Sequence, residues 1–161
     1  MSRFERLRSR VLSAATAVQP VALLLVRVVV GLVFVFSGWG KLHGLDHVIE
    51  YFRELGIPFP ELQAPFVATV EFVGGLAVVL GLGTRVAVIP LSATMVVAIL
   101  TAKLKGLDGP SDVLFFSETD YLVFFFALFA FGAGRFSLDA LIARRSAAVL
   151  AAPKVAPLVI A

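Results

Sequence analysis

Four long apolar stretches, separated by short polar or Gly/Pro-rich segments, dominate the chain. They lie at about 20–39, 66–82, 86–104 and 119–133. A helix needs about 20 apolar residues to cross the hydrocarbon core of a bilayer, and backbone groups in lipid must be satisfied within the element itself. The strict polar/apolar alternation of a membrane β-barrel is missing from these stretches. The pattern therefore predicts an all-α membrane protein, a bundle of four transmembrane helices.

Two shorter segments are amphipathic. The first lies between the first two spans, and its apolar side is formed by Leu45, Val48, Ile49, Phe52 and Leu55. The second follows the fourth span, where Ser137 is suited to be the N-cap of a helix that begins at Leu138. Amphipathic helices of this kind lie in the membrane interface. We expect one in the first external loop and another after the fourth span.

Basic residues concentrate on one side of the predicted bundle. With four spans, the two termini and the loop between the second and third spans share a side. That side carries nine basic residues: Arg3, Arg6, Arg8, Arg10, Arg85, Arg135, Arg144, Arg145 and Lys154. The other side carries four: Lys41, Arg53, Lys103 and Lys105. The positive-inside rule then places both termini in the cytoplasm. A cleaved secretory signal at the basic N-terminus is the alternative.

We expect a single membrane domain with two cytoplasmic extensions. A basic lead occupies residues 1–19, the four-helix domain 20–142, and an Ala/Pro-rich tail, expected to be mobile, 143–161. Hydrophobic residues make up 60% of the chain and charged residues 16%, against about 25% charged in soluble domains. The net charge of +3 comes from residues near the span ends rather than from a basic stripe. We therefore expect a lipid bilayer as the partner and no nucleic acid.

Charged and small residues inside the spans are the candidates for function and packing. Ionisable side chains in a membrane usually face the bundle interior, which singles out Arg27 and Glu71. Glycines let helices approach closely, and Gly31, Gly38, Gly74 and Gly75 share faces with these charges. We expect these glycines to be packing positions. The chain has no cysteine, which excludes cysteine metal sites and thiol nucleophiles.

Depth in the membrane decides which charges can pair. At a rise of 1.5 Å per residue, Arg27 lies about 10 Å from the inner edge and Glu71 about 9 Å from the outer edge. In a core of about 30 Å they are offset by about 11 Å, so a direct pair is disfavoured. Glu71 can pair with Lys41, with Lys103 or with neither. Arg27 either reaches the inner interface or bonds to backbone carbonyls, or it has a functional role.

The outer ends of the spans bring several polar residues towards one another. The members of this outer polar cluster are Lys41, His43, Glu71, Lys103, Glu118 and Asp120. Two interpretations stay open. The cluster is either a set of interfacial charges with one buried pair, or a functional site, which is a pocket for a small polar or quinone-like head group or a place of proton exchange. No catalytic residue is assigned. No metal site is expected, because His43 and His47 would need a continuous helix through Gly44 to bind the same metal ion.

Ordered motifs over about residues 20–142 resemble those of the DoxX family. They comprise Arg27, Gly31, Phe34, Gly38, Lys41, Tyr51-Phe52, Gly56-Ile57-Pro58, Glu71, Gly74-Gly75, Leu80-Gly81, Gly83-Thr84-Arg85, Gly134-Arg135 and Ser137-Leu138-Asp139. The resemblance implies a small four-helix protein of the bacterial inner membrane. Family members are named for similarity to a subunit of an archaeal thiosulfate:quinone oxidoreductase. Some are linked to oxidative-stress resistance, and others anchor complexes with a superoxide dismutase and a sulfurtransferase.

Three functions remain open at this point. The first is an accessory or anchor subunit of a membrane redox or oxidative-stress system, without turnover on its own. The second is a binding protein for a quinone or another small ligand, using the outer polar cluster. The third is an oligomeric transporter or cargo-handling protein. A homo-oligomer or a soluble or membrane redox partner is expected in each case.

Overall fold

The computed structural model describes residues 3–104 and 109–151, and this part of the chain is helical, without strands. The helices are α1 (Arg3–His43), α2 (Leu45–Glu54), α3 (Pro60–Leu80), α4 (Thr84–Ala98), α5 (Ser117–Phe131) and α6 (Leu138–Ala151). A π-helical turn, Ile99–Lys103, continues α4, and a 3₁₀ segment, Pro110–Phe115, precedes α5. Lys105, Lys154 and most of the expected tail lie outside the described residues.

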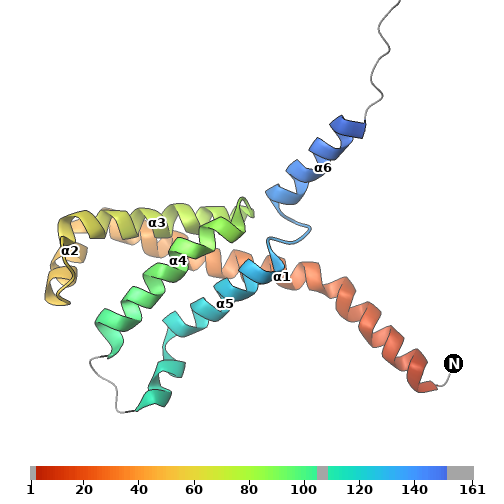
Figure 1. The fold of residues 1–161 in the computed structure, drawn as a ribbon, viewed down its shortest axis with the longest axis horizontal. Coiled ribbons are helices and arrows are strands. Elements are labelled where there is room, and N and C mark those ends of the chain that lie inside the picture. The colour runs from red at the N-terminus through yellow and green to blue at the C-terminus, as the bar shows by residue number, and fades with distance from the viewer. Residues whose placement is uncertain (1–2, 105–108, 152–161) are drawn as a thin grey trace, which may run out of the picture.

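The helices are arranged as two antiparallel pairs. α1 and α3 lie side by side along their shared length, and α4 and α5 form the second pair (Figure 1). α2 lies at one end of the bundle, hereafter the α2 end. The turn between α3 and α4 lies at the opposite, α6 end. The core between the pairs contains Phe34 from α1, Val78 from α3, Leu91 from α4, and Phe125 and Leu128 from α5.

Glycines, which have no side chain, allow α1 and α3 to pack at close range. A Cβ atom built on Gly38 would lie 2.3 Å from the backbone nitrogen of Phe72, and one on Gly75 would lie 2.7 Å from that of Val35. Neither contact leaves room for a methyl group. Gly74 instead faces α4, because a Cβ there would lie 3.0 Å from the side chain of Leu91.

Three helices in the described part of the chain are long and apolar enough to cross a membrane. They are Arg3–His43, Pro60–Leu80 and Thr84–Lys103. The fourth expected span corresponds to α5, which has 15 residues. Extended backbone at Phe116 precedes it, and Gly132, at φ 74°, ends it. The all-helical membrane fold is thus confirmed, and the count of four spans stays a prediction.

The first helix is much longer than the expected span. It has 41 residues, beginning at Arg3 and running through Pro20 without a break. A proline inside a helix costs one backbone hydrogen bond, yet the helix continues on both sides of it. The boundary expected at residue 20 therefore does not mark the start of the helix.

The short helices lie where the amphipathic patterns place them. α2 follows α1 after Gly44, and α6 begins at Leu138. The hydroxyl of Ser137 accepts a hydrogen bond from the backbone N–H of Ala140 at 3.1 Å, as expected of an N-cap. α6 extends to Ala151, past the expected domain boundary at 142.

Candidate functional site

A cavity of about 760 Å³ opens towards the α2 end of the bundle. Its walls come from both helix pairs and from the apolar side of α2. Most of the lining is apolar and includes Val33, Phe34, Phe52, Ile57, Phe66 and Val97. The volume lies in the range of about 300–1,000 Å³ that is usual for small-molecule sites. The lysine and glutamate side chains of the lining gather at two places.

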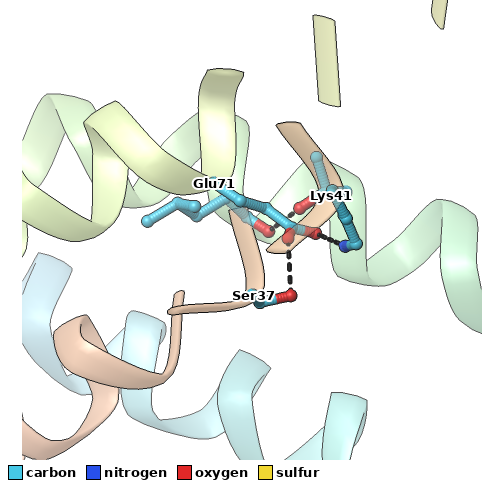
Figure 2. A network of polar contacts seen from close by, with 5 residues as sticks. Ser37, Lys41 and Glu71 are labelled. Atoms are coloured by element: carbon cyan, nitrogen blue, oxygen red, sulfur yellow. Dashed lines mark hydrogen bonds and ion pairs between the residues drawn. The ribbon is translucent and has the colours of Figure 1, made fainter. Parts of the chain in front are cut away.

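The first polar group is a buried network centred on Glu71 (Figure 2). Glu71 lies in the middle of α3, and the residue as a whole is 1% exposed. Lys41 Nζ forms an ion pair with one carboxylate oxygen, and the hydroxyl of Ser37 donates to the other at 2.8 Å. Ser37 and Lys41 lie one turn apart on α1, with Gly38 between them allowing α3 to approach. Both carboxylate oxygens are therefore satisfied inside the membrane domain.

Lys41 keeps binding capacity towards the cavity. An ammonium group has three donors, and Glu71 takes one of them. The Lys41 side chain is 31% exposed, whereas that of Glu71 is 2% exposed. The network thus presents N–H donors, rather than carboxylate oxygens, to a ligand.

The second polar group, Lys103 and Glu118, is looser. Lys103 Nζ lies 3.7 Å from a carboxylate oxygen of Glu118, and the Lys103 side chain is 42% exposed. The ammonium also lies 5.7 Å from the ring centroid of Phe116. Lys103 is the last residue of the π-helical turn, a feature that often occurs at functional sites. This pair contributes a second ammonium group to the cavity lining.

Four of the six residues of the outer polar cluster line the cavity: Lys41, Glu71, Lys103 and Glu118. His43 is exposed, and its Nδ1 lies 2.9 Å from the backbone oxygen of Trp39. Asp120 is exposed on the first turn of α5. Neither belongs to the lining. The rotation of α1 and α5 about their own axes places the side chains of His43 and Asp120 away from the space between the two helix pairs.

Several polar residues of the lining were not among the sequence candidates. Ser37 carries the clearest signal, because it precedes Lys41 by one helical turn on the glycine-bearing face of α1. His47, Gln63, Thr94 and Tyr121 also line the cavity. In the described part of the chain, no group of three or more His, Asp or Glu side chains is placed to hold a metal ion.

Arg27 lies near the α6 end, away from this cavity. Its guanidinium donates to the backbone oxygens of Ala133 at 2.5 Å and Phe136 at 2.6 Å. The residue is 2% exposed. Of the alternatives left open by the sequence, the structure shows carbonyl bonding. Arg27 thereby fixes the segment between α5 and α6 against α1.

Comparisons with known proteins match this architecture to a family. The family model described as DoxX matches residues 22–104. The chain is 36% identical over 83 residues to "Putative oxidoreductase CatD" of Bacillus subtilis, covering 52% of this chain and 60% of that protein. It thus spans less than two thirds of that relative. No solved structure matches it.

Two further relatives are covered over most of their length. Inner membrane protein YphA of Escherichia coli is 31% identical over 128 residues, covering 76% of this chain and 91% of that protein. An uncharacterized membrane protein of Mycobacterium tuberculosis is 34% identical over 140 residues, covering 80% of this chain and 86% of that protein. The matched family region contains Ser37, Lys41 and Glu71. This chain is a membrane protein of the DoxX family.

Proposed function

We propose that the protein binds a small, membrane-soluble molecule with an apolar body and a hydrogen-bond-accepting head. The observation that carries this proposal is the position of the Lys41–Glu71 pair in a mostly apolar cavity. A quinone carbonyl is one head group of this kind. The two ammonium groups donate to the head, and the aromatic and aliphatic walls hold the body.

The balance of donors and acceptors supports an accepting head. The carboxylate of Glu71 already receives bonds on both oxygens from Lys41 and Ser37, and its side chain is only 2% exposed, so a ligand has little access to it. Lys103 and Glu118 are separated by 3.7 Å, which is longer than a normal charge-assisted hydrogen bond of about 2.7–2.9 Å. A carbonyl or ionised oxygen placed between the ammonium groups would gain donors without displacing a tight internal bond.

The test removes one of the two head-group donors, Lys41, without changing the net charge of the protein. In the double variant Lys41→Met/Glu71→Met, the buried pair is replaced by apolar side chains of similar length. Native mass spectrometry in mild detergent would measure binding of a decyl-substituted benzoquinone. We expect affinity at least about tenfold weaker than for the parent, equivalent to about 1.4 kcal/mol.

The control variant neutralises an exposed ion pair. Arg53 pairs with Glu61 at 2.8 Å outside the cavity, so Arg53→Gln/Glu61→Gln should bind the benzoquinone as the parent does. A cavity-filling variant, Ala98→Phe, should bind less benzoquinone than either the parent or this control. Unchanged benzoquinone occupancy in Lys41→Met/Glu71→Met and Ala98→Phe, or no binding to the parent, would contradict the proposal. Glu71→Gln alone should also lose occupancy.

A second candidate function is that of an accessory subunit in a membrane redox system. It is favoured by the similarity to "Putative oxidoreductase CatD" of Bacillus subtilis and by the absence of cysteine from all 161 residues. Thiol chemistry on a sulfur donor would then come from another chain. The purified protein alone should not reduce the benzoquinone with thiosulfate as donor, and sustained reduction would overturn this candidate.

For the topology, we propose four spans with both termini in the cytoplasm of a bacterial cell. α5 would be the fourth span, and its 15 residues cover about 22 Å. Because the chain has no cysteine, single cysteines report cleanly. The variant Ser111→Cys should react with a membrane-impermeant maleimide in intact spheroplasts. Ser9→Cys and Ser146→Cys should react only after permeabilisation, and the reverse pattern would reject this topology.

A further inference from the structure

The N-terminal part of α1 extends beyond what a bilayer can enclose. A helix of 41 residues is about 60 Å long, while the hydrocarbon core is about 30 Å thick. Figure 1 shows this red part of α1 leaving the bundle and projecting from it. We call residues 3–19 the basic arm. Every residue of the arm is exposed.

The basic arm is amphipathic. Phe4, Leu7, Val11, Ala14 and Val18 recur at intervals of three and four residues, so they form one apolar stripe along the helix. Phe4 is 75% exposed, and Leu7, Val11 and Val18 are exposed as well. In the described part of the chain, no other element covers this stripe.

Arginines flank the stripe. At 100° per residue, Arg3 and Arg10 fall on one side of it and Arg8 on the other, with Arg6 further round. The opposite side of the helix carries Ser9 and Ser13, whose hydroxyls donate to the backbone oxygens of Arg6 and Arg10 at 2.9 Å. With four arginines and Glu5, the arm has a net charge of +3.

We propose that the basic arm lies on the bilayer surface and binds anionic lipid head groups. The apolar stripe enters the boundary between head groups and acyl chains, while the flanking arginines reach the phosphates. Polybasic segments next to a membrane span are attracted to anionic lipid. Pro20 stands where the arm joins the membrane-embedded part of α1, and its missing N–H lets the helix bend there.

The arm lies outside the matched family region, which begins at residue 22. No residue of the arm lines the cavity, so this surface is separate from the cavity and from the ligand proposed for it. Its chemistry selects lipid with phosphate-bearing, negatively charged head groups over zwitterionic lipid. The stripe and the charge are both needed. The apolar stripe sets how deeply the arm enters the bilayer, and the arginines select anionic lipid.

Two tryptophan probes at neighbouring positions test the orientation. The chain has one tryptophan, so Trp39→Phe supplies a silent background. Leu7→Trp places a probe on the stripe, and Ser9→Trp places one on nearly the opposite side at the same height. Each full-length protein is reconstituted into vesicles of brominated phosphatidylcholine, with or without added phosphatidylglycerol.

We expect quenching of the Leu7→Trp probe to exceed that of Ser9→Trp several-fold in vesicles with phosphatidylglycerol. The difference should shrink without phosphatidylglycerol, in high salt, or with Arg3→Gln/Arg10→Gln. Equal quenching of the two probes, or a difference that ignores lipid charge, overturns the proposal. If the Leu7→Trp probe is shielded without quenching, and dilution to one protein per vesicle removes the shielding, the stripe binds a second copy and the proposal fails.

Discussion

Asp139 caps the N-terminus of α4 from a different part of the chain, because its carboxylate accepts a hydrogen bond from the backbone N–H of Gly83 at 3.0 Å. Its own backbone N–H donates to the oxygen of Gly81 at 3.1 Å. Gly81 and Gly83 both have positive φ, 69° and 55°, and together they make the tight turn between α3 and α4. Asp139 therefore ties the start of α6 to that turn.

Removing this cap should destabilise the bundle without disturbing the cavity. For Asp139→Ala we expect a loss of about 1–2 kcal/mol, typical of helix capping by a carboxylate. Asp139→Asn keeps one accepting oxygen and should fall between the parent and Asp139→Ala. The measurement is reversible unfolding in mixed micelles. If all three proteins unfold at the same denaturant fraction, the cap contributes nothing.

Replacing Arg27 should cost more, because two backbone carbonyl groups lose a donor that is itself buried. Arg27→Met leaves the oxygens of Ala133 and Phe136 unpaired, and each unsatisfied buried group costs about 1–3 kcal/mol. Two such groups sum to about 2–6 kcal/mol. Because both bonds are only part-buried, we expect a loss in the lower part of that range, about 2–4 kcal/mol, in the same unfolding measurement. Arg135, which is exposed, provides the matched control: Arg135→Met should change stability little.

Two glycines on the same helix should respond in opposite ways to alanine. A Cβ on Gly38 would collide with the α3 backbone at 2.3 Å, whereas one on Gly40 would meet nothing within 4 Å. We expect Gly38→Ala to separate α1 from α3 and lower the unfolding midpoint. Gly40→Ala should be neutral, or stabilise by up to about 1 kcal/mol through helix propensity. Equal effects would show that close packing at Gly38 is not required.

Acid should loosen α2. The pKa of Glu61 lies below its ordinary value of 4.5, first because its backbone N–H bonds its carboxylate and then because of Arg53. A depressed pKa stabilises the folded state above pH 4.5, and that contribution disappears as the pH falls through the lower folded value. Spin labels on α2 and α3 should show a broader distance distribution below that pH. Glu61→Gln should be broad at every pH, and a distribution that never changes would refute the link.

Much of this fold follows from local sequence. Apolar length alone locates three spans, and depth in the membrane selects Lys41 or Lys103 as partners for Glu71. The ion pair with Lys41 agrees with that geometry. Ser137 was identifiable as a cap because the pattern is short: one hydroxyl, three residues before the N–H that it bonds.

What the sequence left open depends on segments far apart in the chain. Asp139 bonds a turn 56 residues earlier, and no local pattern encodes that distance. The sequence places His43 and Asp120 at the same membrane depth as the cavity residues, but neither lines the cavity. Whether a side chain faces the cavity depends on the rotation of its helix rather than on depth. The continuity of α1 through Pro20 was missed because a proline after a polar residue favours a helix start over a helix interior.

The bond between Lys41 and Glu71 also bears on how the chain is inserted during synthesis. Lys41 leaves the ribosome before Glu71, so the partner is already in place when a carboxylate must enter lipid. A lone acidic residue at the centre of a span costs about 2.5–3.5 kcal/mol on insertion. We expect α3 to insert poorly by itself and efficiently behind α1, with Lys41→Met abolishing that assistance in a translocon assay. In this protein, the order of synthesis supplies the counter-ion.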